Sequence, residues 1–247
     1  MLFSTLQELE EIAIQSRHTY ARLIHLGALP EIVWNDDARI GRAEGGSLHF
    51  RTDRWGPTWG RLAVCECCDS PGHVEIQNAR GGDVLQVCAT ATTSTLAWAA
   101  CLAKLAAPAT ETANEVRLTG FPLLPGDLHP LREPVDILPT LLAALGREEA
   151  AVRFLLHTPE VAHLREFIPR HLIGEYPLMV ATDFRTTLQL ALPPVQRLAC
   201  GSDLSLHLAG PGNTLLLSLA AAEAHEPAWR DALAATFPSI RSFLSTP

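Results

Sequence analysis

The sequence predicts an α+β fold made of two similar halves, each an antiparallel β-sheet with helices at one face or end. Three observations lead to this prediction. A unit of two β-like runs and one helical pattern occurs twice along the 247 residues. Helical patterns and β-like runs fall into separate blocks and do not alternate as βαβ units do, which favours antiparallel pairing. With 47% hydrophobic residues, the chain also has enough apolar side chains for a large core.

The repeat is clearest in its hairpins. Residues 73–87 read HVEIQNARGGDVLQV, and residues 203–217, which begin 130 positions later (203 − 73 = 130), read DLSLHLAGPGNTLLL. In each copy a glycine-rich turn separates two β-like runs, as in a tight hairpin. A helical pattern with one tryptophan follows each hairpin, at 94–106 with Trp98 and at 226–236 with Trp229. Because solenoid repeats are only about 20–50 residues long, this spacing indicates a duplicated domain.

Helical patterns also open each half. Residues 6–26 form the first, after Ser4 and Thr5, which are typical of a capping-box start. Residues 136–146 and 148–156 form two more, before the second set of strands. We therefore expect each half to begin with helices and to place its strands later.

A connector is expected between the halves. Residues 108–134 contain five prolines, together with threonines and glycines, which is typical of an irregular linking segment. The predicted organisation is a first half over residues 1–107, a connector over 108–135, and a second, more divergent copy over 136–247.

Composition excludes several classes of partner. A net charge of −8 argues against nucleic acid, because no electropositive field is available for phosphates. The longest apolar stretches are shorter than the roughly 20 residues that cross a bilayer, and no secretory signal is recognisable, so we expect a cytoplasmic protein without a membrane span. No glycine-rich phosphate loop indicates a nucleotide cofactor. The sequence is compatible with a homodimer. We expect the six cysteines to be reduced.

The segment 46–64 carries the richest chemistry. Strand alternation predicts that His49, Arg51 and Asp53 share one face. The candidate site residues of this segment are His49, Arg51, Trp55, Trp59 and Arg61. An imidazole, guanidinium groups and indoles together suit a flat, anionic, aromatic ligand. The competing interpretation is a solvated strand face with tryptophans packed in the core.

Cysteines and histidines offer weaker patterns. Cys65, Cys67 and Cys68 are close enough for a soft-metal site, but a second ligand pair is missing, so ordinary thiols are the simpler interpretation. His157 and His163 stand on either side of Pro159, at the expected break between the helices of the second half. Their spacing matches no ligand motif and equally fits a surface or capping role.

The chain resembles the haemin-degrading and haem-carrier proteins of bacterial haem utilisation, of the HemS, ChuS and ChuX type. The resemblance is carried by the strand Leu48-His49-Phe50-Arg51, the tryptophans Trp55 and Trp59, the hairpin over 74–87 and the helix with Trp98. It covers residues 46–105 well and residues 189–237 faintly. It implies two stacked halves and haem held in a cleft by an axial histidine and by arginines near the propionates.

What the resemblance implies for the residues is specific. Arg51 matches the strand arginine that contacts haem in the family, and His49 is expected on the same face. His157 and His163 lie in the region of the axial ligand without its motif. We therefore expect a haem-binding protein that carries haem or releases its iron inside the cell; no sequence feature demonstrates a degradative step.

Two other functions are kept. A protein of this fold could have lost haem and bind another small anionic or apolar ligand or a protein partner. The cysteines at 65, 67 and 68 could instead handle a metal.

Overall fold

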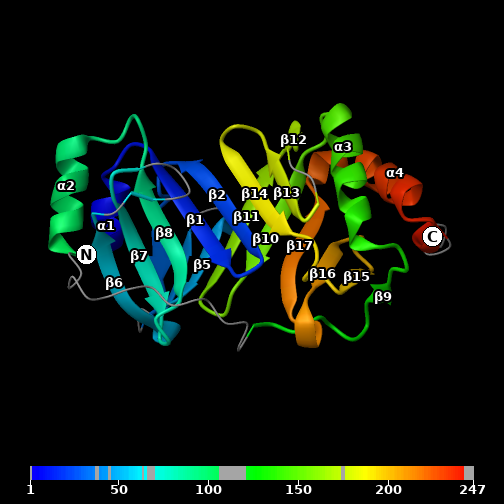
Figure 1. Cartoon of the computed structure of the whole chain (residues 1–247), viewed down its shortest axis with the longest axis horizontal. Coiled ribbons are helices and arrows are strands. Elements are labelled where there is room, and N and C mark those ends of the chain that lie inside the picture. Colours follow the sequence, from blue (N-terminus) through cyan, green and yellow to red (C-terminus); the bar gives the residue numbers. More distant parts are fainter. Residues whose placement is uncertain are drawn as a thin grey trace. The chain divides into compact units, whose positions relative to one another are not determined.

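The computed structural model describes residues 2–36, 39–43, 46–62, 64–65, 70–105, 121–173 and 176–241. This part of the chain consists mainly of antiparallel strands with four α-helices, so the predicted α+β class is confirmed (Figure 1). None of the helices in these residues has the length and hydropathy needed to span a membrane.

The chain divides into two compact units. The first comprises Met1–Thr19, Leu23–Thr119 and Thr158–His163, and the second comprises Tyr20–Arg22, Gly120–His157 and Leu164–Pro247. The residue bounds predicted for the halves, and their origin by duplication, stay predictions. Residues 108–120 of the predicted connector lie outside the described residues.

The first unit contains strands of two sheets, together with two helices. In one sheet the strand order is β2-β1-β8-β7-β6, and in the other β3-β4-β5 is extended by residues 161–163 of β11 (Val161–Phe167). The elements are α1 (Leu2–Gln7), β1 (Ile12–His18), β2 (Ala21–Gly27), β3 (Ile32–Trp34), β4 (Ile40–Ala43), β5 (Leu48–Arg51), β6 (Trp55–Arg61), β7 (His73–Asn78), β8 (Asp83–Ala89) and α2 (Thr95–Lys104), with a 3₁₀ turn at Thr52–Arg54.

The core of the first unit joins both sheets. Alternate side chains of β1, β7 and β8, such as Ile14 and Ile76, pack with Leu48 and Phe50 of β5. Helix α2 packs against β6 and adds Trp98 to the same core. The other face of the first sheet is buried too, but it carries polar side chains and the small apolar cluster of Ala13, Cys65 and Cys88.

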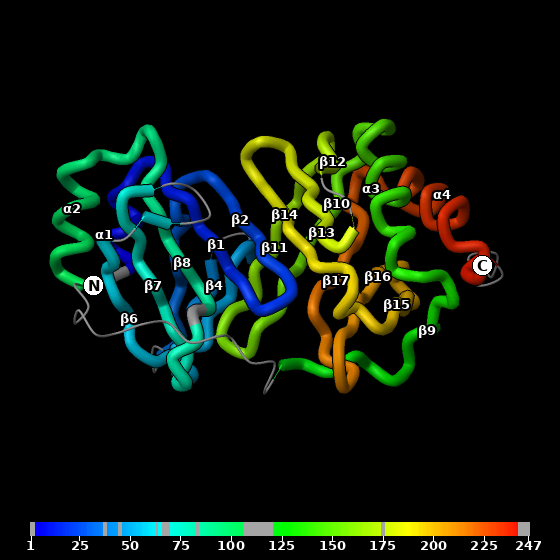
Figure 2. The backbone as a smooth tube through the Cα atoms, viewed as in Figure 1, coloured from blue at the N-terminus to red at the C-terminus, as the bar shows by residue number. Residues whose placement is uncertain are grey.

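The second unit contains the remaining strands of the same two sheets, together with two helices. Helices α3 and α4 pack against each other, α3 contacts β12, and α4 contacts β17 (Figure 2). One sheet has the order β12-β13-β14, and the other has the order β11-β10-β17-β16-β15-β9. The elements are β9 (His129–Pro130), α3 (Leu138–Arg147), β10 (Val152–His157), β11 (Val161–Phe167), β12 (His171–Ile173), β13 (Leu178–Thr182), β14 (Thr186–Ala191), β15 (Arg197–Cys200), β16 (Leu206–Ala209), β17 (Leu215–Ala221) and α4 (Glu226–Thr236), with 3₁₀ turns at Val135–Ile137, Pro211–Asn213, Glu223–His225 and Pro238–Ile240.

Both predicted hairpin–helix units are present. Strands β7 and β8 pair antiparallel, as do β16 and β17, and α2 and α4 follow them. Each helix buries its tryptophan, and the Trp229 indole N–H donates to the carbonyl of Leu204 at 2.9 Å. The local turn chemistry therefore predicted these units correctly.

Two of the predicted opening helices are wrong. Over residues 6–26 only α1 is helical, and the chain continues as β1 and β2. Residues 148–156 lead into β10, where Val152, Phe154 and Leu156 are buried and their neighbours are only half-buried. In both segments β-branched and alternating apolar residues favour a strand, and burial of those side chains against a sheet outweighs the local helical pattern. The helix expected over 136–146 is confirmed as α3.

Gly60 on β6 sets how closely α2 approaches its sheet. A Cβ at this position would lie 2.5 Å from the carbonyl oxygen of Leu102 in α2, a backbone atom that cannot rotate away. We expect Gly60→Ala to lower the free energy of unfolding by about 1–3 kcal/mol through overpacking. Chemical denaturation measures this change.

Gly126→Ala is the matched control, because a Cβ at Gly126 meets no atom within 4 Å. It should change the free energy of unfolding by no more than about 0.5 kcal/mol. Equal stability of the two variants would show that α2 can shift without cost.

Candidate functional site

Strand β5 separates an apolar face from a polar one, as the alternation predicted. Leu48 and Phe50 are fully buried, whereas His49 and Arg51 are half-buried. The strand ends at Arg51, and Asp53 belongs to the 3₁₀ turn that follows. Asp53 still reaches Arg51, whose Nε and Nη2 donate to its two carboxylate oxygens at 3.1 and 2.9 Å. This bidentate pair holds the Arg51 side chain beside the strand.

His49 lies among arginines. Arg42 of β4 is directly opposite His49 in the strand register, so the two side chains share a face, and Arg51 follows on the same side. The pKa of His49 lies below its ordinary value, first because of burial and then because of the positive charges of Arg42 and Arg51. The neutral imidazole is therefore the dominant form at pH 7.

The Nε2 atom of His49 is shielded from solvent and has no hydrogen-bond partner within the described residues. Ring nitrogens of buried histidines normally have one. A neutral imidazole with an unused nitrogen is the form that binds a metal centre. We call Arg42, His49 and Arg51 the His49 face.

Trp55 does not join the His49 face. Its ring meets Phe50 edge-on, with the centroids 5.7 Å apart, and lies 5.7 Å from the ring of Phe3. These contacts place Trp55 against the core of the first unit, which matches the structural interpretation of this residue.

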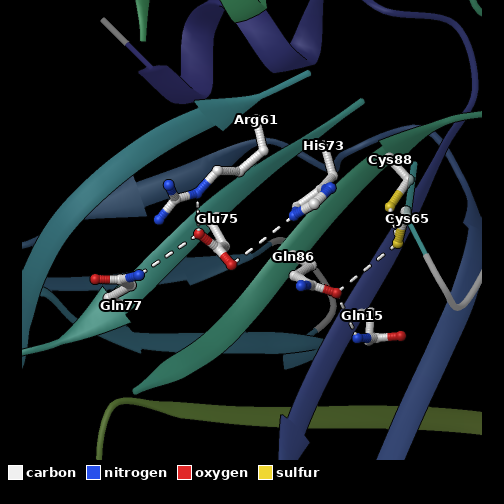
Figure 3. A network of polar contacts seen from close by, with 8 residues as sticks. All are labelled: Gln15, Arg61, Cys65, His73, Glu75, Gln77, Gln86 and Cys88. Carbon is white, nitrogen blue, oxygen red and sulfur yellow. Dashed lines mark hydrogen bonds and ion pairs between the residues drawn. The ribbon is translucent and has the colours of Figure 1, made fainter. Parts of the chain in front are cut away.

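Trp59 and Arg61 belong to the other sheet of the first unit. On β6 they lie opposite Glu75 and His73 of β7, so all four side chains project from the same face of that sheet. The Nε of Arg61 donates to Glu75 at 2.6 Å, and His73 Nε2 lies 3.8 Å from the same carboxylate (Figure 3). Burial raises the pKa of Glu75, but hydrogen bonds from His73 and Arg61 outweigh it and the pKa lies below its ordinary value.

The network continues across the same sheet face. Gln77 of β7 donates to Glu75 at 3.5 Å, and Gln15 of β1 donates to the side-chain oxygen of Gln86 of β8 at 2.8 Å. In Figure 3 these side chains line up across neighbouring strands. We call this set the polar face; its members are Gln15, Trp59, Arg61, His73, Glu75, Gln77 and Gln86. Glu75, Gln77 and Gln86 were missed in the sequence, although HVEIQN alternates polar and apolar residues.

His163 lies in the core, on a strand and not at a break between helices as expected. It is opposite Leu48 in the β5–β11 register and is fully buried. Its Nδ1 is 2.7 Å from the Ser16 hydroxyl of β1, a contact that joins the two sheets of the first unit.

His157 ends β10 in the second unit, and the expectation of a helix break is wrong here too. Its Nε2 lies 3.1 Å from the Ser218 hydroxyl, which lies 2.8 Å from His207 Nδ1. His207 Nε2 is 2.7 Å from the Ser205 hydroxyl, which donates to Asp203 at 2.6 Å. We call these five residues the His157 chain.

The carboxylate sets the direction of the His157 chain. Burial raises the pKa of Asp203, but hydrogen bonds from Ser205 outweigh it, so the group stays an anion and can only accept. Ser205 therefore donates to Asp203 and accepts from His207 Nε2. His207 Nδ1 then accepts from Ser218, which accepts from His157 Nε2. Burial lowers the pKa of both His207 and His157, so both rings are neutral, and in this arrangement each carries its proton on Nε2.

The structure therefore separates the predicted residues. His49 and Arg51 lie together, Trp59 and Arg61 lie together on another sheet, Trp55 packs against the core, and His157 belongs to the second unit. Cys67 and Cys68 lie outside the described residues. Within the described ranges no group of three or more His, Cys, Asp or Glu side chains could hold a metal ion.

The His157 chain predicts a pH dependence of stability. Burial, and secondarily repulsion between the protonated forms of His157 and His207, lowers the pKa of His157 from 6.5 to about 4. The unfolded chain therefore binds this proton below pH 6.5, while the folded chain does not until about pH 4. As the pH is lowered from 6.5 to 4, the free energy of unfolding should therefore decrease, by at most about 3 kcal/mol through this group. Denaturant titrations at several pH values measure the slope.

His157→Gln should have a shallower slope over the same pH range, and the exposed His171→Gln variant should keep the wild-type slope. A His157→Gln slope equal to that of the wild type would contradict the burial of a neutral imidazole here.

The comparisons with known proteins concern the whole chain. No protein-family model matches the sequence, and no curated protein matches it. Solved structures do match. ChuS, an Escherichia coli haem oxygenase, is 13% identical with a TM-score of 0.73, over 95% of this chain and 85% of that one.

PhuS, a haem-binding protein from Pseudomonas aeruginosa, matches in two forms. The apo form is 14% identical with a TM-score of 0.73, over 96% of this chain and 84% of that one. The holo form is 12% identical with a TM-score of 0.74, over 94% and 82%. At these identities the likeness concerns the fold, and the chain has the fold of the haem-degrading and haem-binding proteins ChuS and PhuS.

Proposed function

We propose that this protein binds haem as its cargo and acts in haem utilisation, carrying haem in the cytoplasm or taking part in the release of its iron. Two kinds of observation support the proposal. The fold is that of proteins described as haem-binding and haem-degrading. The His49 face, in addition, offers the side chains that a haem needs.

The observation that carries the proposal is the unused nitrogen of His49. Iron binds a neutral imidazole nitrogen, and Nε2 of His49 is neutral, shielded from solvent and without a hydrogen-bond partner in the described part of the chain. Removing a polar atom from water without a partner is costly, so a ligand that binds it restores a favourable contact. We propose His49 as the axial ligand.

The arginines of the same face fit the rest of the ligand. Haem carries two carboxylates, and guanidinium groups bind carboxylates in a fork geometry. Arg42 is exposed and lies opposite His49, whereas Arg51 is already paired with Asp53. We therefore propose that Arg42 contacts a propionate directly and that Arg51 does so by sharing or exchanging its Asp53 contact.

The remaining predicted site residues take a secondary place in this proposal. Trp59 and Arg61 project from the polar face, and Arg61 is committed to Glu75. His163 is fully buried against Ser16, and the Nε2 of His157 is used by Ser218. We keep His157 and His163 as alternative ligands that the experiment below separates from His49.

Titration of the purified apo-protein with ferric haem tests the proposal. The wild type should give a saturable shift of the Soret band. His49→Ala should raise the dissociation constant at least about tenfold, which corresponds to about 1.4 kcal/mol, and change the position of the band because the iron loses its ligand. Arg42→Gln should weaken binding by several-fold while leaving the band in place.

The matched control is His171→Ala, an exposed histidine of the second unit, which should bind as the wild type does. If His157→Ala or His163→Ala moves the band and His49→Ala does not, haem binding stands and the ligand assignment is wrong. If the wild type gives no shift, haem is not the cargo. The first of the two other functions kept above, a protein of this fold that binds another small anionic or apolar ligand or a protein partner, then becomes the leading one.

A further inference from the structure

Two cysteines that the proposed function does not use are in direct contact. Cys65 lies between β6 and β7, and Cys88 lies on β8, paired with Ala13 and His73 of the neighbouring strands. Their sulfur atoms are 3.2 Å apart, with Cys88 donating to Cys65. Figure 3 shows the two side chains pointing toward each other at one end of the polar face.

The surroundings of the pair hold it in place. Cys65 and Cys88 are 2% and 0% exposed, and they pack with Ala13 and Leu26. The backbone N–H of Cys65 donates to the carbonyl of Ser70 at 2.9 Å, and its thiol faces the side-chain oxygen of Gln86 at 4.0 Å. Neither sulfur therefore needs a large backbone movement to approach the other.

The other described cysteines lack this arrangement. Cys101 is buried on α2, and Cys200 is buried on β15 with its thiol donating to the carbonyl of Gly201 at 3.5 Å. In the described part of the chain, neither of them faces a second sulfur. Oxidation to an intramolecular disulfide thus has one favoured place among these four thiols.

We propose that Cys65 and Cys88 form a reversible disulfide when the protein meets a peroxide. In the first step the sulfur of one cysteine attacks a peroxide oxygen; the O–O bond breaks, a sulfenic acid forms, and one water leaves. In the second step the other sulfur attacks the sulfenic sulfur; the S–S bond forms and a second water leaves. Two thiols lose two electrons, one hydrogen peroxide gains them, and both thiol protons end in water.

The new bond changes the sheet on which the pair lies. It ties the segment that follows β6 to β8, across 23 positions of sequence. It also removes both S–H donors, so Gln86 loses its contact from Cys65 and keeps the one from Gln15. A disulfide that closes a loop of this size restricts the unfolded chain, so the oxidised protein should unfold at a higher temperature by several degrees.

The test exposes the full-length protein to a small excess of hydrogen peroxide and then quenches the reaction with catalase. Unreacted thiols are alkylated with N-ethylmaleimide under denaturing conditions, and peptides are mapped by mass spectrometry before and after reduction. We expect a peptide pair joined through Cys65 and Cys88 that separates on reduction, while Cys101 and Cys200 stay fully alkylated.

The variant Cys67→Ser/Cys68→Ser removes the two neighbouring thiols and should still form the Cys65–Cys88 pair. Cys101→Ser is the matched control for replacing a buried thiol of the same unit and should also form it. Cys88→Ser should form no such disulfide and should show no rise in unfolding temperature after peroxide treatment. Circular dichroism verifies that this variant is folded. If it does not fold, the peptide map of the wild type still tests the proposal.

Two results would overturn the proposal. One is complete alkylation of Cys65 and Cys88 after a peroxide treatment that oxidises glutathione in a parallel tube. The other is a disulfide that joins Cys65 to Cys67 or Cys68 in place of Cys88.

Discussion

Burial of both faces of β7 and β8 is the constraint on which the first unit depends. One face of these strands supplies apolar side chains to the core, and the other carries charged and amide groups that are also shielded from water. A buried polar group is costly unless it is hydrogen-bonded, so each of these groups needs a partner from a neighbouring strand. Arg61 of β6 supplies such a partner to Glu75 of β7, and Gln15 of β1 supplies one to Gln86 of β8, so the order β1-β8-β7-β6 brings these partners together.

The second unit meets the same requirement with uncharged groups. At the centre of its sheet, Ser218 lies between two neutral histidines, and Asp203, the charged member of the His157 chain, is at the exposed end of that chain. Buried ion pairs repay their desolvation only with good geometry, whereas neutral hydrogen bonds carry a smaller penalty. The two units therefore satisfy similar sheet positions with different chemistry. With a net charge of −8, the haem dianion proposed above would have to be attracted by local cations such as Arg42 and Arg51.

Local sequence patterns correctly predicted the features of the fold that depend on local interactions. The glycine turns predicted both hairpins, and the period-two pattern predicted the two faces of β5. The segment 6–26 shows where this fails, because pairing of β1 with β8, some 70 residues away, converts it into strands. The partners of the site residues were out of reach for the same reason. Arg42 meets His49, and Glu75 meets Arg61, only through strand registers that no local pattern encodes.

In the His157 chain, the proton positions of the two histidines depend on each other. Each hydroxyl in it has one proton to give, so no member can reverse its hydrogen bond alone. The tautomers of His157 and His207 are therefore coupled through the hydroxyls, and the Asp203 carboxylate sets the direction of both. Neutralising the exposed Asp203 carboxylate would remove this tautomer preference from His157, although three side chains, those of Ser205, His207 and Ser218, lie between the two groups.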